Sequence, residues 1–151
     1  MAIRKIIKDD DEMLRYKSRE VTEFNEKLWT LLDDMRETMY KAAGVGLAAP
    51  QVAILKRIAI IDADDGEGVI ELINPEITCA DGSEIKVEGC LSVENRHGEV
   101  ERPTKVTVKY MDRNGDEQQK ILEGLAARAA CHEIDHLNGI LFLDKMIRET
   151  E

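Results

Sequence analysis

Two histidines one helical turn apart are the residues of this chain best suited to chemistry. His132 and His136 enclose the segment HEIDH, residues 132–136. Side chains at positions i and i+4 lie on the same face of an α-helix, so both imidazoles can bind one metal ion. Glu133 follows the first histidine and lies near enough to accept a proton from a metal-bound water. The spacing therefore predicts a hydrolytic metal site.

The alternative is a helix that carries two histidines and no metal. The residues before the pair are small and predict a helix packed closely against its neighbours: Ala126, Ala127, Ala129 and Ala130. Buried imidazoles need polar partners, and a metal ion is one such partner. Burial therefore favours the metal site but leaves the plain structural interpretation open.

A catalytic metal site usually has three protein ligands, so a third must come from elsewhere. Cys131 is adjacent to His132 and points about 100° away from the ligand face, which is typical of a buried helix thiol. Cys90, in the segment EGCLS after a predicted strand, and Cys79 are candidates, as are His97 and the carboxylates. Spacing alone does not choose Cys90 over Cys79.

The elements predicted around these residues are two helices that bracket a set of short strands. Helical spacing of apolar residues predicts a helix over 25–41, capped by Asn25, and a second over 124–137. A helical turn is predicted within 9–19. The predicted strands are 57–62, 68–73 (ended by Asn74-Pro75), 77–79, 85–87, 105–111 and 118–122, the last two joined by a turn at Asn114-Gly115. This order indicates an α+β fold.

Length and composition favour one globular domain over residues 1–151. The chain has 43% hydrophobic and 34% charged residues, which is ordinary for a folded domain, and its net charge of −10 argues against a broad nucleic-acid surface. No apolar run is long enough to span a bilayer, and the N-terminal segment lacks the apolar core of a signal peptide. We therefore expect a cytoplasmic protein, in which three cysteines are not a disulfide framework.

Three segments in this order resemble the peptide deformylase family. They are residues 44–51 (GVGLAAPQ), 88–92 (EGCLS) and 132–136 (HEIDH), which match the family patterns G-x-G-x-A-A-x-Q, E-G-C-L-S and H-E-x-D-H. The resemblance extends over most of the chain. It implies antiparallel β-sheets packed around a central metal-binding helix, with an N-terminal helix.

By this resemblance, the chain removes the formyl group from the N-formylmethionine of nascent polypeptides and releases formate. One divalent ion per chain is implied, usually Fe²⁺ with Zn²⁺, Ni²⁺ or Co²⁺ as substitutes, bound by Cys90, His132 and His136. A metal-bound water would attack the formyl carbon, with Glu133 as general base and then acid. Gln51 and the backbone N–H of Leu91 would stabilise the developing oxyanion.

The resemblance also implies a substrate cleft lined by Gly44, Val45, Gly46, Glu88, Gly89 and His97. Gly44 and Gly46 leave room for a peptide backbone, although Gly46 suits a structural turn equally well. Candidates for the methionine pocket are Ala129 and Cys131. Two departures from the family pattern bear on substrate affinity: Glu94 where proline is common, and His97 where arginine is common. His97 either contacts substrate or lies in a solvated loop.

We expect a monomer that acts on a formylmethionyl peptide, without membrane contact or direct DNA binding. The resemblance leaves open a transient contact with the ribosome. Two other functions compete. A zincin-like peptidase would cleave peptide bonds without releasing formate, and the Cys90 segment argues against it. A non-enzymatic paralogue would keep a structural metal and bind formylated peptides, and the presence of Glu133 and Gln51 argues against that.

Overall fold

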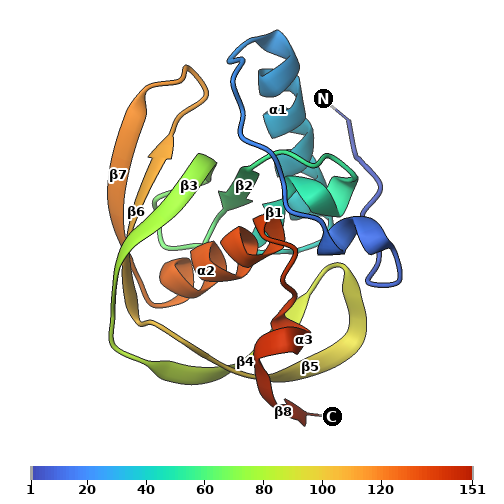
Figure 1. Cartoon of the computed structure of the whole chain (residues 1–151), viewed down its shortest axis with the longest axis vertical. Helices are drawn as coiled ribbons and strands as arrows, with labels where there is room; N and C mark the ends of the chain where they lie inside the picture. Colours follow the sequence, from blue (N-terminus) through green and yellow to red (C-terminus); the bar gives the residue numbers. More distant parts are fainter. Residues whose placement is uncertain (1, 151) are drawn as a thin grey trace.

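The first long helix carries the predicted apolar stripe. In the computed structural model, which describes residues 2–150, α1 spans Glu26–Lys41 (Figure 1). Asn25 caps the helix, as predicted, by accepting a hydrogen bond from the backbone N–H of Leu28. One face is buried in a cluster with β1 and β2, through Leu28, Leu31, Leu32, Met35 and Met39.

A five-stranded antiparallel sheet forms the larger layer within the described residues, in the order β1-β2-β3-β6-β7. Its strands are β1 (Gly46–Ala48), β2 (Ile58–Ile61), β3 (Ile70–Asp81), β6 (Lys105–Met111) and β7 (Glu117–Glu123). In β6 the predicted alternation is confirmed, because Val106, Val108 and Tyr110 are buried. The predicted hairpin joins β6 to β7.

Strand β3 shows that the predicted break at Asn74-Pro75 is wrong. The strand continues through both residues and includes 77–79, which the sequence pattern predicts as a separate strand. The register with β6 shifts between Ile73 and Glu76, where Asn74 has a φ of 51°. Proline therefore lies at an irregularity in the pairing, where its missing N–H is tolerated.

A smaller antiparallel sheet has the order β4-β5-β8 within residues 2–150. The strands are β4 (Glu84–Cys90), β5 (Val93–Arg102) and β8 (Met146–Thr150). Of this sheet, only residues 85–87 are predicted as a strand from the sequence pattern. Strand β5 reads VENRHGEVER and buries Val93, Gly98, Val100 and Arg102, so its pattern of apolar residues is too weak to predict a strand.

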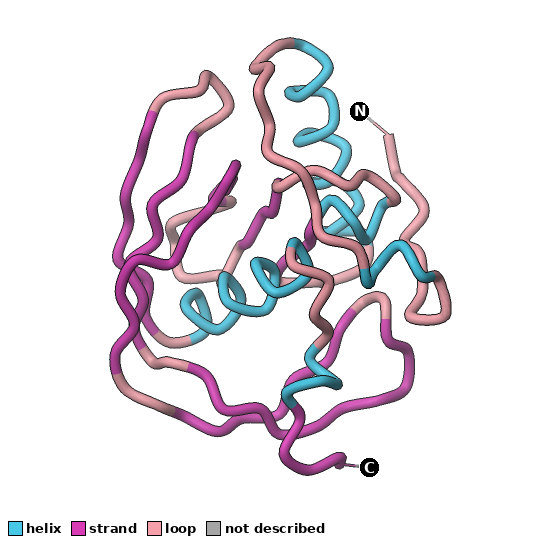
Figure 2. Tube along the Cα trace, viewed as in Figure 1, coloured by secondary structure: helices cyan, strands magenta, loops and turns pink. Residues whose placement is uncertain are grey.

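Helix α2 (Leu125–Leu137) runs through the middle of the molecule, between the two sheets (Figures 1 and 2). Every residue from Ala126 to Leu137 is buried, and the alanines allow close contact with β1 and β2. The α+β class, with antiparallel sheets around a central helix, is confirmed. This arrangement buries the segment HEIDH at the centre of the fold.

Three short helices complete the described part of the chain: η1 (Glu12–Arg15), η2 (Ala49–Val52) and α3 (Phe142–Lys145). Helix η1 confirms the predicted helical turn within 9–19. Helix η2 follows β1 directly and places Gln51 in the interior, 1% exposed. Within residues 2–150, no helix combines the length and apolarity needed to cross a membrane.

Candidate active site

Helix α2 presents both histidines to one buried space. His132 and His136 are 8% and 1% exposed, and their ring centroids lie 5.1 Å apart. The separation agrees with one turn of helix between the two residues. The ring of His132 also stacks on Phe142, at a centroid distance of 6.1 Å. Both imidazoles are therefore fixed in place by the core around them.

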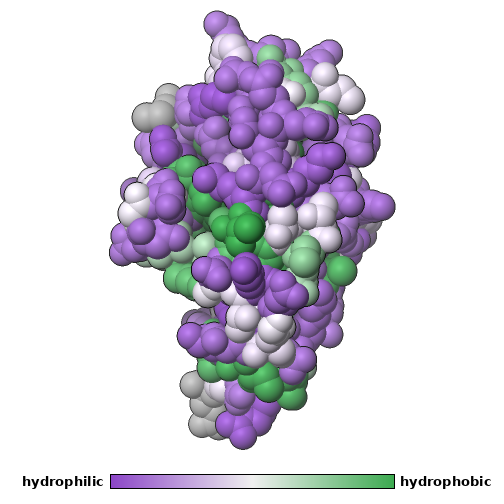
Figure 3. Space-filling view, turned by 90° about the vertical axis from the view of Figure 1, so that its left-hand side faces the viewer, coloured by the Kyte–Doolittle hydropathy of each residue, from purple (hydrophilic) through white to green (hydrophobic). Residues whose placement is uncertain are grey.

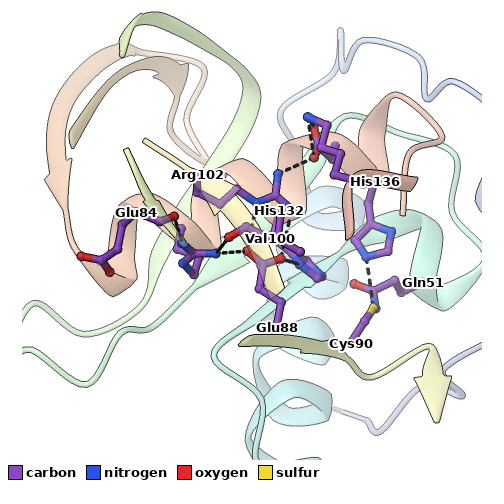
Figure 4. Close-up of polar contacts among 11 residues, drawn as sticks. Gln51, Glu84, Glu88, Cys90, Val100, Arg102, His132 and His136 are labelled. Atoms are coloured by element: carbon purple, nitrogen blue, oxygen red, sulfur yellow. Dashed lines mark hydrogen bonds and ion pairs between the residues drawn. The ribbon is translucent and has the colours of Figure 1, made fainter. Parts of the chain in front are cut away.

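The third donor in this space is Cys90, at the end of β4. Its Sγ atom lies 3.3 Å from Nε2 of His136 (Figure 4). Donor atoms of Cys90, His132 and His136 all lie within 4.8 Å of one another. Cys79 is exposed on β3, and Cys131 is buried in the core between α2 and the larger sheet. The choice that spacing leaves open is therefore made by the fold.

These three residues fit a divalent metal ion. Thiolate and imidazole donors suit Fe²⁺, Co²⁺, Ni²⁺ and Zn²⁺. Burial lowers the pKa of His136, so its imidazole is neutral and free to bind a cation. Burial also opposes protonation of His132, but the charge of Glu133 and hydrogen bonds with Cys90 and Glu88 raise its pKa to about 10. Surroundings that favour an imidazolium also favour a metal ion at the same place.

Glu133 points into the same space and has a carboxylate oxygen to spare. The residue is 4% exposed, and its Oε1 atom is buried without a hydrogen-bond partner among the described residues. Burial raises the pKa of Glu133 to about 7, close to the value that suits proton transfer at neutral pH. Strand β1 makes room for the carboxylate, because a Cβ atom at Gly46 would lie 2.5 Å from Glu133 Oε2.

Gln51 is held with its amide nitrogen toward Cys90. Its Oε1 atom accepts a hydrogen bond from the backbone N–H of Ala48, at 2.9 Å. Its Nε2 atom donates to Ser92 Oγ at 3.0 Å and lies 3.5 Å from Cys90 Sγ. The amide cannot turn over without losing these contacts. Leu91, between Cys90 and Ser92 in the turn from β4 to β5, lines the same cavity.

A buried network of charged side chains surrounds His132 (Figure 4). Glu88 accepts two hydrogen bonds from Arg102, at 2.9 and 3.0 Å, and one from Arg128, at 2.5 Å. Its other contact is with His132 Nδ1, at 2.9 Å. Burial opposes ionisation of Glu88, but hydrogen bonds from His132 and Arg102 lower its pKa to about 2. As an ionised acceptor, Glu88 fixes the proton on Nδ1 and leaves Nε2 of His132 to face the metal site.

Sequence reasoning misses the partners of Glu88 in this network. Arg102 also donates to Asp135 at 2.6 Å, and Arg128 also donates to the carbonyl oxygens of Val100 and Glu84. Arg128 could have been noticed, because it is a single charge within a run of small residues. The carboxylate of Glu88 is engaged by Arg102, Arg128 and His132, which gives the residue a role in orienting His132. That Glu88 also contacts substrate stays a prediction.

A cavity of about 400 Å³ opens beside these groups. All the residues predicted for the substrate cleft contribute to its lining: Gly44, Val45, Gly46, Glu88, Gly89 and His97. Ala129 lines it as well, whereas Cys131 does not. Val45, Val87 and Leu125, each about half exposed, give the lining an apolar component. Figure 3 shows apolar side chains gathered in the middle of one face, with polar side chains above them.

The comparisons with known proteins agree on one family. The polypeptide deformylase family model matches residues 3–151. A peptide deformylase of Caldicellulosiruptor bescii is 62% identical over 148 residues, which cover 98% of this chain and 88% of the relative. One of Alkaliphilus metalliredigens is 60% identical, with 99% and 100% coverage. The crystal structure of peptide deformylase from Thermotoga maritima has 42% identity and a TM-score of 0.93, with 97% and 99% coverage.

Proposed function

The chain belongs to the polypeptide deformylase family, and from that premise we propose that it is a metal-dependent deformylase acting on N-formylmethionyl peptides. Members of this family are hydrolases that remove the formyl group from nascent peptides. The finer proposal concerns how this chain does so. In this proposal three residues bind a metal ion, one carboxylate transfers a proton, and two hydrogen-bond donors stabilise the formyl oxygen.

The proposed metal ligands are Cys90, His132 and His136, with Fe²⁺ as the resident ion and Zn²⁺, Ni²⁺ or Co²⁺ as substitutes. Three protein ligands leave an open position, as catalytic sites require. When bound, the metal supplies Lewis-acid chemistry, which lowers the pKa of a coordinated water and polarises a carbonyl. The burial of the histidines and the Glu88 contact to His132 support this assignment.

Glu133 carries the proton in this proposal. Its unpartnered Oε1 atom takes a proton from the attacking water, and the same carboxyl group then donates a proton to the leaving amine. A pKa of about 7 suits both steps, because the group can gain and lose the proton near neutral pH. Formate and a peptide with a free amino terminus are the products.

Gln51 and Leu91 stabilise negative charge on the formyl oxygen. The Gln51 amide is anchored through its oxygen by Ala48, so its nitrogen faces Cys90 and the cavity. The backbone N–H of Leu91 is the second donor. Donors aimed at a developing oxyanion are worth roughly 3–4 kcal/mol each in other hydrolases.

The cavity accommodates an extended peptide with an apolar first side chain. Its lining includes Gly44, Val45 and Gly46, at and just before β1, and Gly89 and His97, from β4 and β5. The apolar groups at Val87, Leu125 and Ala129 suit a methionine side chain. We expect the enzyme to act as a monomer in the cytoplasm, as one catalytic domain over 1–151, where a transient contact with the ribosome would bring it to nascent chains.

The observation that carries this proposal is the unpartnered Glu133 carboxylate beside the converging Cys90, His132 and His136. The test is formate release from formyl-Met-Ala-Ser by protein reconstituted anaerobically with Fe²⁺. We expect rapid release from the wild type and a loss of at least about a hundredfold in Glu133→Gln. Glu101→Gln, at an exposed glutamate on β5, is the control and retains full activity.

Folded, metal-loaded protein that releases no formate would contradict the deformylase assignment. Cleavage of the Met-Ala bond without formate would indicate a peptidase instead. Equal rates in Glu133→Gln and the wild type would remove Glu133 from the mechanism while leaving the family assignment intact.

A further inference from the structure

The N-terminal segment forms a strap (residues 7–9) that touches both halves of the proposed formyl-oxygen site. The backbone N–H of Ile7 donates to the carbonyl oxygen of Gln51 at 2.8 Å. Two residues later, the N–H of Asp9 donates to the carbonyl oxygen of Ser92, also at 2.8 Å. Figure 1 shows this segment passing beside the turn between β4 and β5. The strap therefore links helix η2 to that turn.

Lys8 adds a side-chain contact to the same turn. Its ammonium group donates to the carbonyl oxygen of Leu91 at 3.2 Å and pairs with Glu94 Oε1 at 2.9 Å. The Lys8 side chain is 43% exposed and that of Glu94 is 64% exposed, so the ion pair itself contributes little. The contact with Leu91 is different, because it fixes a peptide group directly beside the proposed donor.

Gln51 and Leu91 come from separate segments, 40 residues apart in the numbering, and their donors must converge on one oxygen atom. Small displacements of such donors are costly, since oxyanion stabilisation depends on their fixed geometry. Direct contact between the two segments runs through the Gln51 amide, to Ser92 Oγ and Cys90 Sγ. The strap supplies a second link, because its backbone N–H groups donate to the carbonyl oxygens of Gln51 and Ser92.

We infer that Lys8 is a positioning residue for the formyl-oxygen site, holding the Leu91 peptide in register with Gln51. The inference rests on the proposed function for its kinetic consequence, but the contact itself is testable without turnover. Lys8 touches neither substrate nor metal in this account. It acts through the turn that carries Leu91.

The experiment compares Lys8→Met, which keeps the length of the side chain without its charge, with Lys8→Arg and Lys5→Met. Lys5 lies in the same segment and is exposed, so Lys5→Met matches the loss of charge. In Lys8→Met we expect kcat for formyl-Met-Ala-Ser to fall about tenfold with KM within twofold. The reason is that the hydrogen bond from the Leu91 N–H to the formyl oxygen, which the variant would misalign, stabilises the transition state more than the bound substrate. Lys8→Arg should restore most of the rate, and Lys5→Met should match the wild type.

Two readouts separate this effect from general damage and from failure of the proposed function. The visible absorption spectrum of the Co²⁺-loaded protein should be the same in all variants, because Lys8 does not contact a metal ligand. In metal-free protein, the carbonyl ¹³C resonance of Leu91 should shift in Lys8→Met but not in Lys5→Met. That shift is measurable even if the wild type releases no formate. An absence of formate release would contradict the proposed function but not the contact between Lys8 and Leu91.

Any of four results would overturn the inference. One is an unchanged kcat in Lys8→Met, and another is a rate loss that Lys5→Met reproduces. The third is a Glu94→Gln variant as slow as Lys8→Met, because the ion pair rather than the Leu91 contact would then carry the effect. An altered Co²⁺ spectrum in Lys8→Met would also count against it, since the metal site itself would have moved.

Discussion

Gly46 shows how a missing side chain can determine where a catalytic group lies. The residue is on β1, opposite Glu133 on α2, and a Cβ atom there would lie 2.5 Å from Oε2 and 3.0 Å from Cγ and Cδ of the glutamate. Such distances are too short for any unstrained contact. The sequence leaves open whether Gly46 faces substrate or is a structural glycine, and the structure adds a third function, which is to leave space for the Glu133 side chain.

We predict that Gly46→Ala lowers kcat by about a hundredfold, because a carboxylate displaced by about 1 Å transfers protons poorly. The new methyl group meets a side chain rather than backbone, so the fold should persist. Formate release and thermal unfolding measure the two effects. Activity within twofold of the wild type would show that the Glu133 carboxylate can shift without loss.

At the scale of the elements, three of them meet at one buried carboxylate. Glu88 comes from β4, Arg102 from β5, and Arg128 and His132 from α2. Two guanidinium groups share this carboxylate, and Asp135 is a second carboxylate partner of Arg102, at 2.6 Å. Buried charges are tolerated only when paired and hydrogen-bonded, so the smaller sheet and the central helix are bound to each other here.

Glu88→Gln should weaken both stability and metal binding. Loss of the charge leaves Arg128 buried without a carboxylate partner, and we expect the metal-free protein to lose about 3 kcal/mol in the free energy of unfolding. Zn²⁺ affinity should fall roughly 10- to 100-fold, since His132 loses the group that orients it. Urea unfolding and a competition titration measure these changes.

Glu101→Gln, on the exposed side of β5, is the matched control for both measurements. It should change neither stability nor Zn²⁺ affinity appreciably. If Glu88→Gln behaved like this control, the network would be incidental to the fold and to the metal site.

At the scale of the whole molecule, the beginning of the chain docks on the turn that ends α2. The N–H of Ser18 donates to the carbonyl oxygen of Leu137 at 2.8 Å, and Arg15 pairs with Asp144 at 2.5 Å. Gly139 makes the closest approach, because a Cβ atom there would lie 2.4 Å from the carbonyl oxygen of Arg15. Residues 15–18 therefore contact the segment that follows α2, and the Arg15–Asp144 pair joins helix η1 to helix α3, although the two are far apart in sequence.

Gly139→Ala should destabilise the protein by about 2–4 kcal/mol. The residue has a φ of 74°, which strains any L side chain, and the added methyl group would strike backbone that cannot move aside easily. Gly68→Ala is the control, since its φ is 72° but open space surrounds it. That variant should lose only about 1 kcal/mol in the free energy of unfolding. Equal losses in the two variants would show that the close approach of Gly139 to Arg15 does not contribute to stability.

The Arg15–Asp144 pair should make a small contribution to stability that disappears in acid. Partial burial alone would raise the pKa of Asp144, but hydrogen bonds from Arg15 and the N–H of Leu141 lower it below 3.8. A carboxyl group with a lowered folded pKa stabilises the protein above its unfolded pKa, and the effect is lost as pH falls through the folded value. Both side chains are more than one-third exposed, so the gain is below about 1 kcal/mol.

Asp144→Asn should therefore be slightly less stable than the wild type at pH 7, and this difference should shrink as the pH falls below 3.8. Urea unfolding at several pH values measures it. A difference that stayed constant down to pH 2 would mean that the charge of Asp144 is not its source.

The sequence alone determined the parts of this protein that depend on local periodicity and chemistry. Helix α1, strand β6 and helix α2 follow from apolar spacing, and the pairing of His132 with His136 follows from the helical repeat. The resemblance named Cys90, Gln51 and Leu91, and all three line the cavity or contact the histidines. These features could be predicted because each depends on the spacing of apolar residues or on a short motif of residues close together in the sequence.

Only the tertiary structure decided the features that join distant segments. The convergence of Cys90 on the two histidines, the binding of Glu88 by Arg102 and Arg128, and the course of β3 through Pro75 depend on partners many residues away. Strand β5 was missed because its burial comes from the sheet and helix around it and leaves little apolar pattern in its own residues. Chain folding brings these residues together, and no spacing rule along a single chain can specify such contacts.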